Sequence, residues 1–305
     1  MVADDGARDA QWAFDAYEAV RHRLPAADFP TRSTRIDNLG DLAADFDVFL
    51  LDAFGVLNIG EAVVPGAPER VRDLQALGKT VKVLSNSGGY PKRLLLERWD
   101  RLGYDIAPSD ILCSREVLLR TLETRPARKF GLLASQRFGL EELEHLNADF
   151  LCEDPATYDA TEEFLFFGSA EWTEQRQFLL EASLAADPRP VLVANPDIVA
   201  PREGGLSREL GHFAHRLADA TGITPEFFGK PFSHIFEMSL ADLPFTPDRS
   251  RILMVGDTLQ TDILGGAAAG LKTALITGHG SLENMDVSQA IARSGITPDY
   301  ILPTI

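Results

Sequence analysis

Short apolar runs alternate with amphipathic segments along most of the chain. The runs at 46–52, 80–86 and 251–257 are apolar at both odd and even positions, which is typical of parallel strands buried on both faces. Helical patterns lie between such runs, and a glycine such as Gly78 marks where a helix ends. This alternation of strands and helices predicts an α/β fold built on a doubly wound parallel sheet.

The predicted elements cover most of the sequence. We predict strands at 46–52, 80–86, 129–134, 164–169, 190–195, 251–257, 272–278 and 298–304. We predict helices at 8–24, 69–78, 91–103, 112–124, 137–147, 171–186 and 206–221, with a Gly/Ala-rich helix after 257. The N-terminal helix has an apolar face at helical spacing, and Phe14 lies off that face. The face consists of Trp12, Ala16, Ala19, Val20 and Leu24.

The middle of the chain repeats the alternation with a different spacing, which indicates a second α/β unit inserted into the first. We predict a helical N-terminal extension at 1–40, a core domain formed by 41–108 and 223–305, and an inserted α/β domain at 109–222. In doubly wound sheets the chemistry lies outside the carboxyl ends of the strands. We therefore expect the functional side chains at those ends.

The charge balance narrows the classes of partner. The chain has 305 residues, with 29 basic and 46 acidic side chains and a formal net charge of −17. This argues against binding to nucleic acids or to anionic membranes, since both need a basic surface. There is no apolar run of ~18 residues and no signal-peptide pattern, so we expect a cytoplasmic protein. The two cysteines, Cys113 and Cys152, are too few for a disulfide framework, and we expect both to be buried in the inserted domain.

Four polar side chains stand at strand ends or in adjacent loops, where packing does not require them. Asp52 and Asp257 end two strands, Ser85 ends another, and Lys230 lies in a loop. If these segments meet at one edge of the sheet, two carboxylates, a hydroxyl and an ammonium converge. Such a group suits a phosphate held beside a divalent cation, and hard oxygen ligands favour Mg²⁺.

The order and spacing of these motifs resemble class IIA of the haloacid-dehalogenase-like superfamily. This branch includes N-acetylglucosamine-6-phosphate, 4-nitrophenyl and phosphoglycolate phosphatases. The resemblance covers roughly 45–282. It rests on FLLDAFGVLNIGEAVVPGA, LSNSGG, GKP, GDTLQTDILGGAAAG and, in the inserted segment, VANPD. It implies a Rossmann-like core whose inserted domain is an α/β cap, and a Mg²⁺-dependent phosphatase of small phosphorylated metabolites. By analogy with relatives, it also suggests a homodimer formed through the cap.

The resemblance implies a nucleophile and a metal site. Asp52 would form an aspartyl-phosphate and also bind Mg²⁺. Phe54 would bind the ion through its backbone carbonyl, Asp257 directly through its carboxylate, and Asp262 through a water molecule or from just outside the coordination sphere.

The resemblance also implies a set of phosphate contacts. Ser85 would hydrogen-bond the transferring phosphoryl group, and Lys230 would offset the negative charge of the nucleophile and the phosphate. Further substrate-binding positions are Asn86, the amides of Ser87 and Gly88, and, from the cap, Asn195 and Asp197. Arg202 in the cap is a candidate contact for a charged substrate.

The sequence departs from the family at one position. Phe54 stands where the family has a second aspartate, which protonates the leaving group and then activates water. General acid–base help typically contributes ~10²–10⁴-fold, so turnover would be weak or restricted to activated phosphates unless another group supplies the proton. Candidate substitutes are Glu61, Asp197 and His279.

Two other readings stay open at this point. A non-catalytic protein that binds a phosphorylated ligand would also retain the four polar groups, and it would explain Phe54. Dehalogenation or phosphonate cleavage is disfavoured, because the metal set is complete and the cap lacks a recognisable Schiff-base lysine. His212 and His215 have a spacing that can bind a metal. Because no third ligand fits the pattern, we expect them to lie on an ordinary helix face instead.

Overall fold

The computed structural model describes residues 9–202 and 205–305, and for residues 201, 202 and 205 it describes the backbone alone. The helices are α1 Ala10–Ala19, α2 Ala67–Ala76, α3 Lys92–Arg101, α4 Ser114–Leu122, α5 Pro155–Asp159, α6 Glu174–Ala186, α7 Leu210–Thr221, α8 Ser233–Ala241, α9 Leu264–Ala268 and α10 Val287–Ser294. The strands are β1 Thr34–Arg35, β2 Val48–Leu51, β3 Asn58–Ile59, β4 Ala62–Val63, β5 Thr80–Ser85, β6 Ile111–Cys113, β7 Phe130–Leu133, β8 Ala148–Phe150, β9 Glu163–Phe166, β10 Val191–Val193, β11 Val199–Arg202, β12 Gly205–Arg208, β13 Glu226–Phe227, β14 Ile252–Gly256, β15 Lys272–Ile276 and β16 Tyr300–Leu302.

The larger sheet, called here the core sheet, has seven strands in the order β1-β16-β15-β14-β2-β5-β6. All of its paired strands run parallel. Every residue of β2 is fully buried, and its side chains alternate between two apolar clusters on opposite faces: Phe49 and Leu51 join one, Val48 and Leu50 the other. The predicted doubly wound parallel sheet, with strands apolar on both faces, is confirmed.

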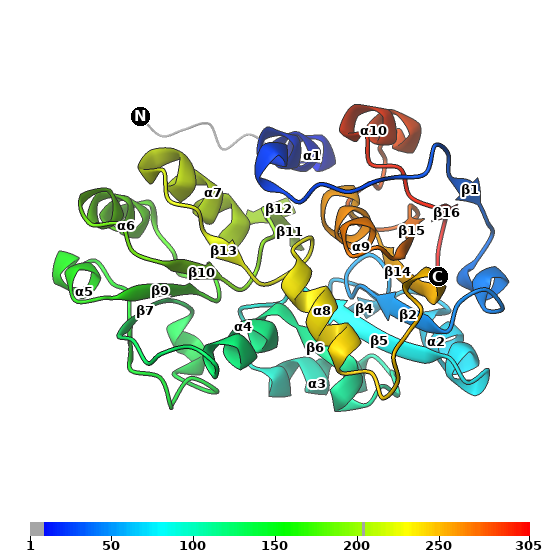
Figure 1. The fold of residues 1–305 in the computed structure, drawn as a ribbon, viewed down its shortest axis with the longest axis horizontal. Helices are drawn as coiled ribbons and strands as arrows, with labels where there is room; N and C mark the ends of the chain where they lie inside the picture. The colour runs from blue at the N-terminus through cyan, green and yellow to red at the C-terminus, as the bar shows by residue number, and fades with distance from the viewer. Residues whose placement is uncertain (1–8, 203–204) are drawn as a thin grey trace.

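A second sheet, the cap sheet, has five parallel strands in the order β13-β10-β9-β7-β8. In Figure 1 it lies to the left of the core sheet, with α5, α6 and α7 around it. β6 belongs to the core sheet and β13 to the cap sheet. We therefore propose that the chain enters the cap after Cys113 and leaves it after Phe227, a few residues later than the 109–222 expected from the sequence.

The prediction of a helix at 137–147 is wrong. This segment forms the 3-10 helix Gln136–Phe138 followed by turns. Both Gly139 and Glu142 adopt a left-handed backbone, with φ of 55° and 70°, which an α-helix does not allow. Glu142 is held there because its carboxylate pairs with Arg115 at 2.6 Å and accepts a hydrogen bond from the Lys92 amide at 2.8 Å.

Several other boundaries also differ from the sequence-based predictions. The helix expected from residue 112 begins at Ser114, because 111–113 complete the core sheet as β6; Cys113 is therefore buried in the core rather than in the cap. The helix expected from 206 begins at Leu210, because β11 and β12 form an antiparallel hairpin. None of the described helices is both long and apolar enough to cross a membrane.

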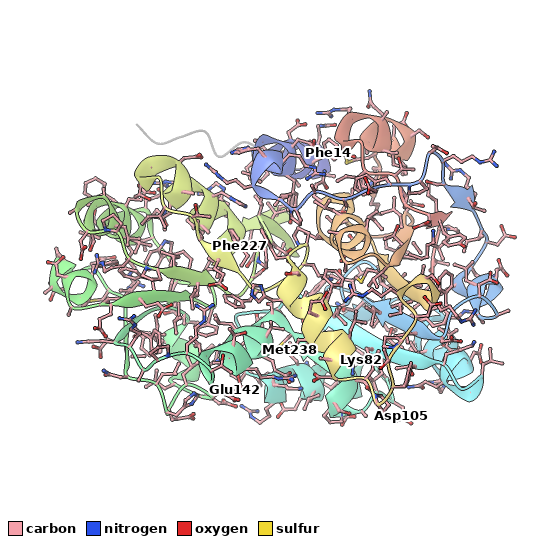
Figure 2. All side chains as sticks on the ribbon, in the orientation of Figure 1. Phe14, Lys82, Asp105, Glu142, Phe227 and Met238 are labelled. Carbon is pink, nitrogen blue, oxygen red and sulfur yellow. The ribbon has the colours of Figure 1, made fainter. Side chains whose placement is uncertain are left out.

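The N-terminal helix α1 exists as predicted, but it buries a different face. Its buried residues are Ala13, Phe14 and Tyr17. Phe14, labelled in Figure 2, packs in an apolar cluster with Leu259 and Ile263 of the core. The predicted apolar face and the buried face are both short apolar stripes on this helix. The buried one is selected by the packing of Phe14 in that cluster.

Two glycines of the Gly/Ala-rich helix allow other elements to pack closely against it. A Cβ on Gly265 would lie 2.7 Å from the Phe236 ring, and one on Gly266 would lie 2.8 Å from Met254. Gly270 differs, because a Cβ there would lie 3.9 Å from Arg249 Cδ, an ordinary van der Waals distance, and because the residue ends α9 with a φ of 73°.

Candidate active site

The polar strand ends lie at one edge of the core sheet. β2 lies between β14 and β5, and its last residue, Leu51, is in register with Val255 and Val83. Asp52 continues this register, since its amide donates to the Val255 carbonyl at 2.9 Å. Because all three strands run parallel, Asp52 and Asp257, which follow β2 and β14, lie at the same edge of the sheet as Ser85, the last residue of β5.

Three carboxylates form a compact cluster at this edge. Oxygens of Asp52, Asp257 and Asp262 all lie within 4.8 Å of one another. Lys230, which is 1% exposed, places Nζ 2.5 Å from Asp52 Oδ1 and 2.7 Å from Asp262 Oδ1. One buried ammonium among three carboxylates leaves an excess of negative charge, and the donors are all hard oxygens. This combination fits a divalent cation such as Mg²⁺.

The electrostatics of the cluster follow from its burial. Burial raises the pKa of Asp52 to about 8, with Lys230 acting against this shift and the neighbouring carboxylates adding to it. Burial and the charge of Asp262 raise the pKa of Asp257 to about 7. Burial acts against the charged form of Lys230, but Asp262 and Asp52 outweigh it and hold the Lys230 pKa above its ordinary value. The metal-free site therefore takes up protons at neutral pH.

Two residues that sequence reasoning missed hold these carboxylates in place. The Ser281 amide donates to Asp257 Oδ2 at 2.5 Å, and its hydroxyl donates to the Asp257 carbonyl at 2.6 Å. The Thr258 amide donates to Asp262 Oδ2 at 3.1 Å, and its hydroxyl donates to Asp257 Oδ1 at 3.2 Å. Thr258 belongs to the GDT motif and could have been found there, whereas no local pattern marks Ser281.

The backbone after Asp52 approaches the carboxylates closely. A Cβ on Gly55 would lie 2.5 Å from Asp257 Cγ, and Gly55 has a φ of 75°. Only glycine satisfies both conditions. This approach brings the peptide between Phe54 and Gly55 near Asp257. The family resemblance predicts that the Phe54 carbonyl of this peptide is a metal ligand.

The side chain of Phe54 packs against other side chains of the core. It lies against the apolar cluster of the core, and Arg98 stacks over its ring at 4.8 Å from the centroid. Arg98 also pairs with Glu61 at 3.2 Å. The Glu61 side chain is 75% exposed and is shared with Arg101 at 3.7 Å. Glu61 is therefore an exposed carboxylate that pairs with two arginines.

Hydrogen bonds join the LSNSGG positions that the resemblance predicts to bind phosphate to one another and to Lys230 and Asp197. The Ser87 amide donates to Ser85 Oγ at 3.2 Å. Asn86 Oδ1 accepts from the Lys230 amide at 2.7 Å, while Nδ2 donates to the Lys230 carbonyl at 2.9 Å and to Asp197 Oδ1 at 2.7 Å. Asn86 therefore joins the lysine loop of the core to the cap.

The cap reaches the site through a tight turn. Asn195 Oδ1 accepts from the Asp197 amide at 2.8 Å and so shapes the turn that presents Asp197. Burial raises the pKa of Asp197 to about 7; the hydrogen bond from Asn86 and the charge of Lys230 oppose this shift, and the charge of Asp52 adds to it. Gly88 touches the cap at another point, since a Cβ there would lie 2.7 Å from the Phe167 carbonyl.

The remaining candidates are two histidines of the cap, His279 in a loop next to the carboxylate cluster, and Arg202, whose side chain is not described. His215 is buried against the Phe227 ring at 5.1 Å between centroids, and burial lowers its pKa to about 4. Neither His212 nor His215 joins a metal-ligating group among the described residues. His279 precedes Gly280 in the loop beside Asp257. Arg202 lies outside the residues whose side chains are described.

Comparison with known proteins agrees with this geometry. A family model described as haloacid dehalogenase-like hydrolase matches residues 49–148, and a second, HAD-hydrolase-like model matches 227–305. Human glycerol-3-phosphate phosphatase is 30% identical, with 87% of this chain and 90% of that protein aligned. Human chronophin is 30% identical over 84% of this chain and 90% of its own length.

A solved structure shows the same likeness in three dimensions. The p-nitrophenyl phosphatase from Archaeoglobus fulgidus superposes with a TM-score of 0.73 at 25% identity, covering 85% of this chain and 97% of its own. The chain therefore belongs to the haloacid dehalogenase-like hydrolases, and within them to class IIA.

Proposed function

We propose that the protein is a Mg²⁺-dependent phosphatase of small phosphorylated metabolites that acts through a phosphorylated Asp52. The observation that carries the proposal is the position of Asp52, at the carboxyl end of a buried strand, paired with Lys230 and beside two further carboxylates. The relatives support the reaction class, since two of the three proteins named above are phosphatases by name, one of glycerol 3-phosphate and one of p-nitrophenyl phosphate.

The metal would be held by Asp52, Asp257 and the backbone carbonyl of Phe54, with Asp262 beside them. The donor set fits the ion because it consists of hard oxygens with an excess of negative charge over Lys230. When bound, Mg²⁺ would neutralise the phosphate and the developing negative charge around it. Lys230, which pairs with Asp52 and Asp262, supplies the remaining positive charge.

In the first step, a carboxylate oxygen of Asp52 forms a bond to phosphorus, and the bond from phosphorus to the leaving oxygen breaks. Lys230 and the Ser85 hydroxyl hold the phosphoryl oxygens as charge moves across the group. In the second step, the oxygen of a water molecule bonds to phosphorus and the bond between phosphorus and the Asp52 oxygen breaks, so that dihydrogen phosphate leaves with both water protons and the Asp52 carboxylate is freed. Asn86 fixes the backbone of Lys230 during both steps, so we assign it a positioning role.

The leaving oxygen needs a proton that Phe54 cannot give. We assign this proton to Asp197, because it alone among the three candidate substitutes is tied to the phosphate-binding motif, through Asn86. Its pKa of about 7 keeps a substantial fraction protonated at neutral pH. A protonated carboxyl on the cap side can donate to an alkoxide as the bond to phosphorus breaks.

Phosphate release over a matched substrate panel tests the proposal. The panel contains alkyl sugar phosphates, an aryl phosphate and acetyl phosphate, each with Mg²⁺, with EDTA and with the Asp52→Asn variant. We expect release that EDTA and Asp52→Asn both abolish. No release from any substrate, with Mg²⁺ and phosphate still bound, would favour the alternative of a non-catalytic protein that binds a phosphorylated ligand. A cytoplasmic location and a homodimer stay predictions.

A further inference from the structure

The N-terminal helix α1 lies outside the segments that match the family, which begin at residue 49. In Figure 1 it lies between α7 of the cap and α10 of the core. Residues from both parts contact it.

The core holds α1 through apolar packing, a cation–π contact, an ion pair and a hydrogen bond. Phe14 packs in the cluster that contains Leu259, and Arg293 stacks over the Phe14 ring at 4.8 Å. Arg293 also pairs with Asp15 at 2.6 Å. Gln260, which is 2% exposed, donates to Glu18 Oε1 at 2.9 Å. Leu259 and Gln260 belong to the π-helical turn Leu259–Ile263 that carries Asp262, so α1 is docked on the turn that builds the carboxylate cluster.

The cap holds the end of the same segment. Arg23, in the 3-10 helix Arg21–Arg23 that follows α1, pairs with Asp219 of α7 at 2.5 Å. A second Arg23 nitrogen donates to the His215 carbonyl at 3.3 Å. The N-terminal segment therefore spans the junction, with one part on the core and the other on the cap.

Tyr17 is the point at which this segment reaches the active site. Its side chain is buried, and its hydroxyl accepts a hydrogen bond from the Ile198 amide at 3.2 Å. Ile198 directly follows Asp197, the cap residue bound by Asn86. Burial raises the pKa of Tyr17, and the charges of Asp197, Asp262 and Asp257 raise it further, as expected for a phenol beside the carboxylates of the site.

We propose that α1 is a strap that joins the core to the cap, and that Tyr17 is a positioning residue that holds the 195–198 turn over the active site. The backbone amide of Ile198 and the side chain of Asn86 fix this turn from two sides. Asp197 is thereby kept where a leaving group would depart. This consequence for catalysis rests on the proposed phosphatase function, whereas the strap itself does not.

Amide hydrogen exchange at Ile198, measured by NMR on the full chain with Mg²⁺, tests the strap without any turnover. Tyr17→Phe removes the acceptor and keeps the ring, so Ile198 should exchange about fivefold to tenfold faster, the change expected from losing one ordinary hydrogen bond. Phe14→Ala keeps the hydroxyl but removes the anchor of the helix on the core, and should also speed exchange at Ile198. Tyr158→Phe is the matched control, since it removes a buried tyrosine hydroxyl that donates to Cys152 elsewhere in the cap.

Kinetics then test the positioning role. Tyr17→Phe should lower kcat for an alkyl phosphate by about fivefold to tenfold and leave KM nearly unchanged, because the turn is displaced from the reacting group rather than from bound substrate. Tyr158→Phe should leave both constants unchanged. Wild-type exchange at Ile198 in both Tyr17→Phe and Phe14→Ala would overturn the strap, even in a chain with no phosphatase activity. Faster exchange with unchanged kcat in an active enzyme would overturn the positioning role.

Discussion

The side chain of Asn86 binds both polar groups of the Lys230 backbone. Its Oδ1 accepts from the Lys230 amide at 2.7 Å, and its Nδ2 donates to the Lys230 carbonyl at 2.9 Å. Both residues are buried, so neither hydrogen bond can be replaced by bulk water. The ammonium that lies between Asp52 and Asp262 is therefore placed by a residue from a different strand end.

Asn86→Ala should lose both stability and activity. The buried Lys230 amide would lack an acceptor, which costs about 1–3 kcal/mol, and the displaced ammonium should lower kcat. Thermal unfolding and phosphate release measure the two effects. Asn38→Ala is the control: it removes the asparagine that caps the 3-10 helix Leu39–Leu42 and should cost about 1 kcal/mol with unchanged kcat. Equal kcat values in the two variants would contradict the positioning role of Asn86.

Mg²⁺ should stabilise the protein more strongly as pH rises. The pKa values of Asp52 and Asp257 are raised to about 8 and about 7, so the metal-free folded state binds more protons than the unfolded state above pH ~4. The stability that this protonation provides is present below the unfolded pKa and lost as pH rises toward about 8. Mg²⁺ binds the ionised carboxylates and must displace those protons.

The unfolding temperature with and without Mg²⁺, followed from about pH 5.5 to about pH 8, measures this linkage. We expect the metal-free temperature to fall and the Mg²⁺-induced increase to grow across this range. An increase of constant size would show that the carboxylates are already ionised without the metal.

Asp197→Asn should slow substrates that need a proton on the leaving oxygen. We expect about a 100-fold loss of kcat for an alkyl phosphate and a much smaller loss for an aryl phosphate, whose leaving group departs as an anion. Combining Asp197→Asn with Phe54→Asp should restore alkyl phosphate turnover, because it returns a carboxyl to the core side of the site. Equal losses on both substrates would point instead to a structural role for Asp197.

Gly55→Ala should weaken metal binding through the backbone. The added Cβ would collide with Asp257 Cγ at 2.5 Å and require a left-handed conformation, so we expect Mg²⁺ affinity to fall by about 10–100-fold. Gly103→Ala is a matched control, because Gly103 has a φ of 79° but an added Cβ would have none of the described atoms within 4 Å. It should lose stability but keep its affinity for Mg²⁺, as measured by titration calorimetry.

The position of the active site could be predicted because it depends on strand ends. Asp52, Ser85 and Asp257 each follow a recognisably buried strand, and parallel pairing brings such ends together without further information. Lys230 lies in a loop, and only the GKP motif made its place in the site predictable. The partners that fix these groups, such as Ser281 for Asp257, arise from loop contacts between distant segments and leave no local pattern.

The errors have the same origin in tertiary contacts. The helix expected at 137–147 fails because Glu142 is drawn into a left-handed conformation by Arg115 and the Lys92 amide, which belong to other elements. The buried face of α1 was misassigned because its ten residues are too few for periodicity to decide between two stripes. Tyr17 was missed for the same reason, since only the docked helix shows that it meets Ile198.

The proposed mechanism requires that Asp52 is phosphorylated during turnover. Acid quenching of the enzyme during steady-state hydrolysis of p-nitrophenyl phosphate, followed by peptide mass spectrometry, tests it most directly. We predict the mass of one phosphoryl group on the peptide that contains Asp52, with no such adduct in Asp52→Asn or in the presence of EDTA. Phosphate release by the wild-type enzyme with no adduct, or with retained activity in Asp52→Asn, would contradict the account.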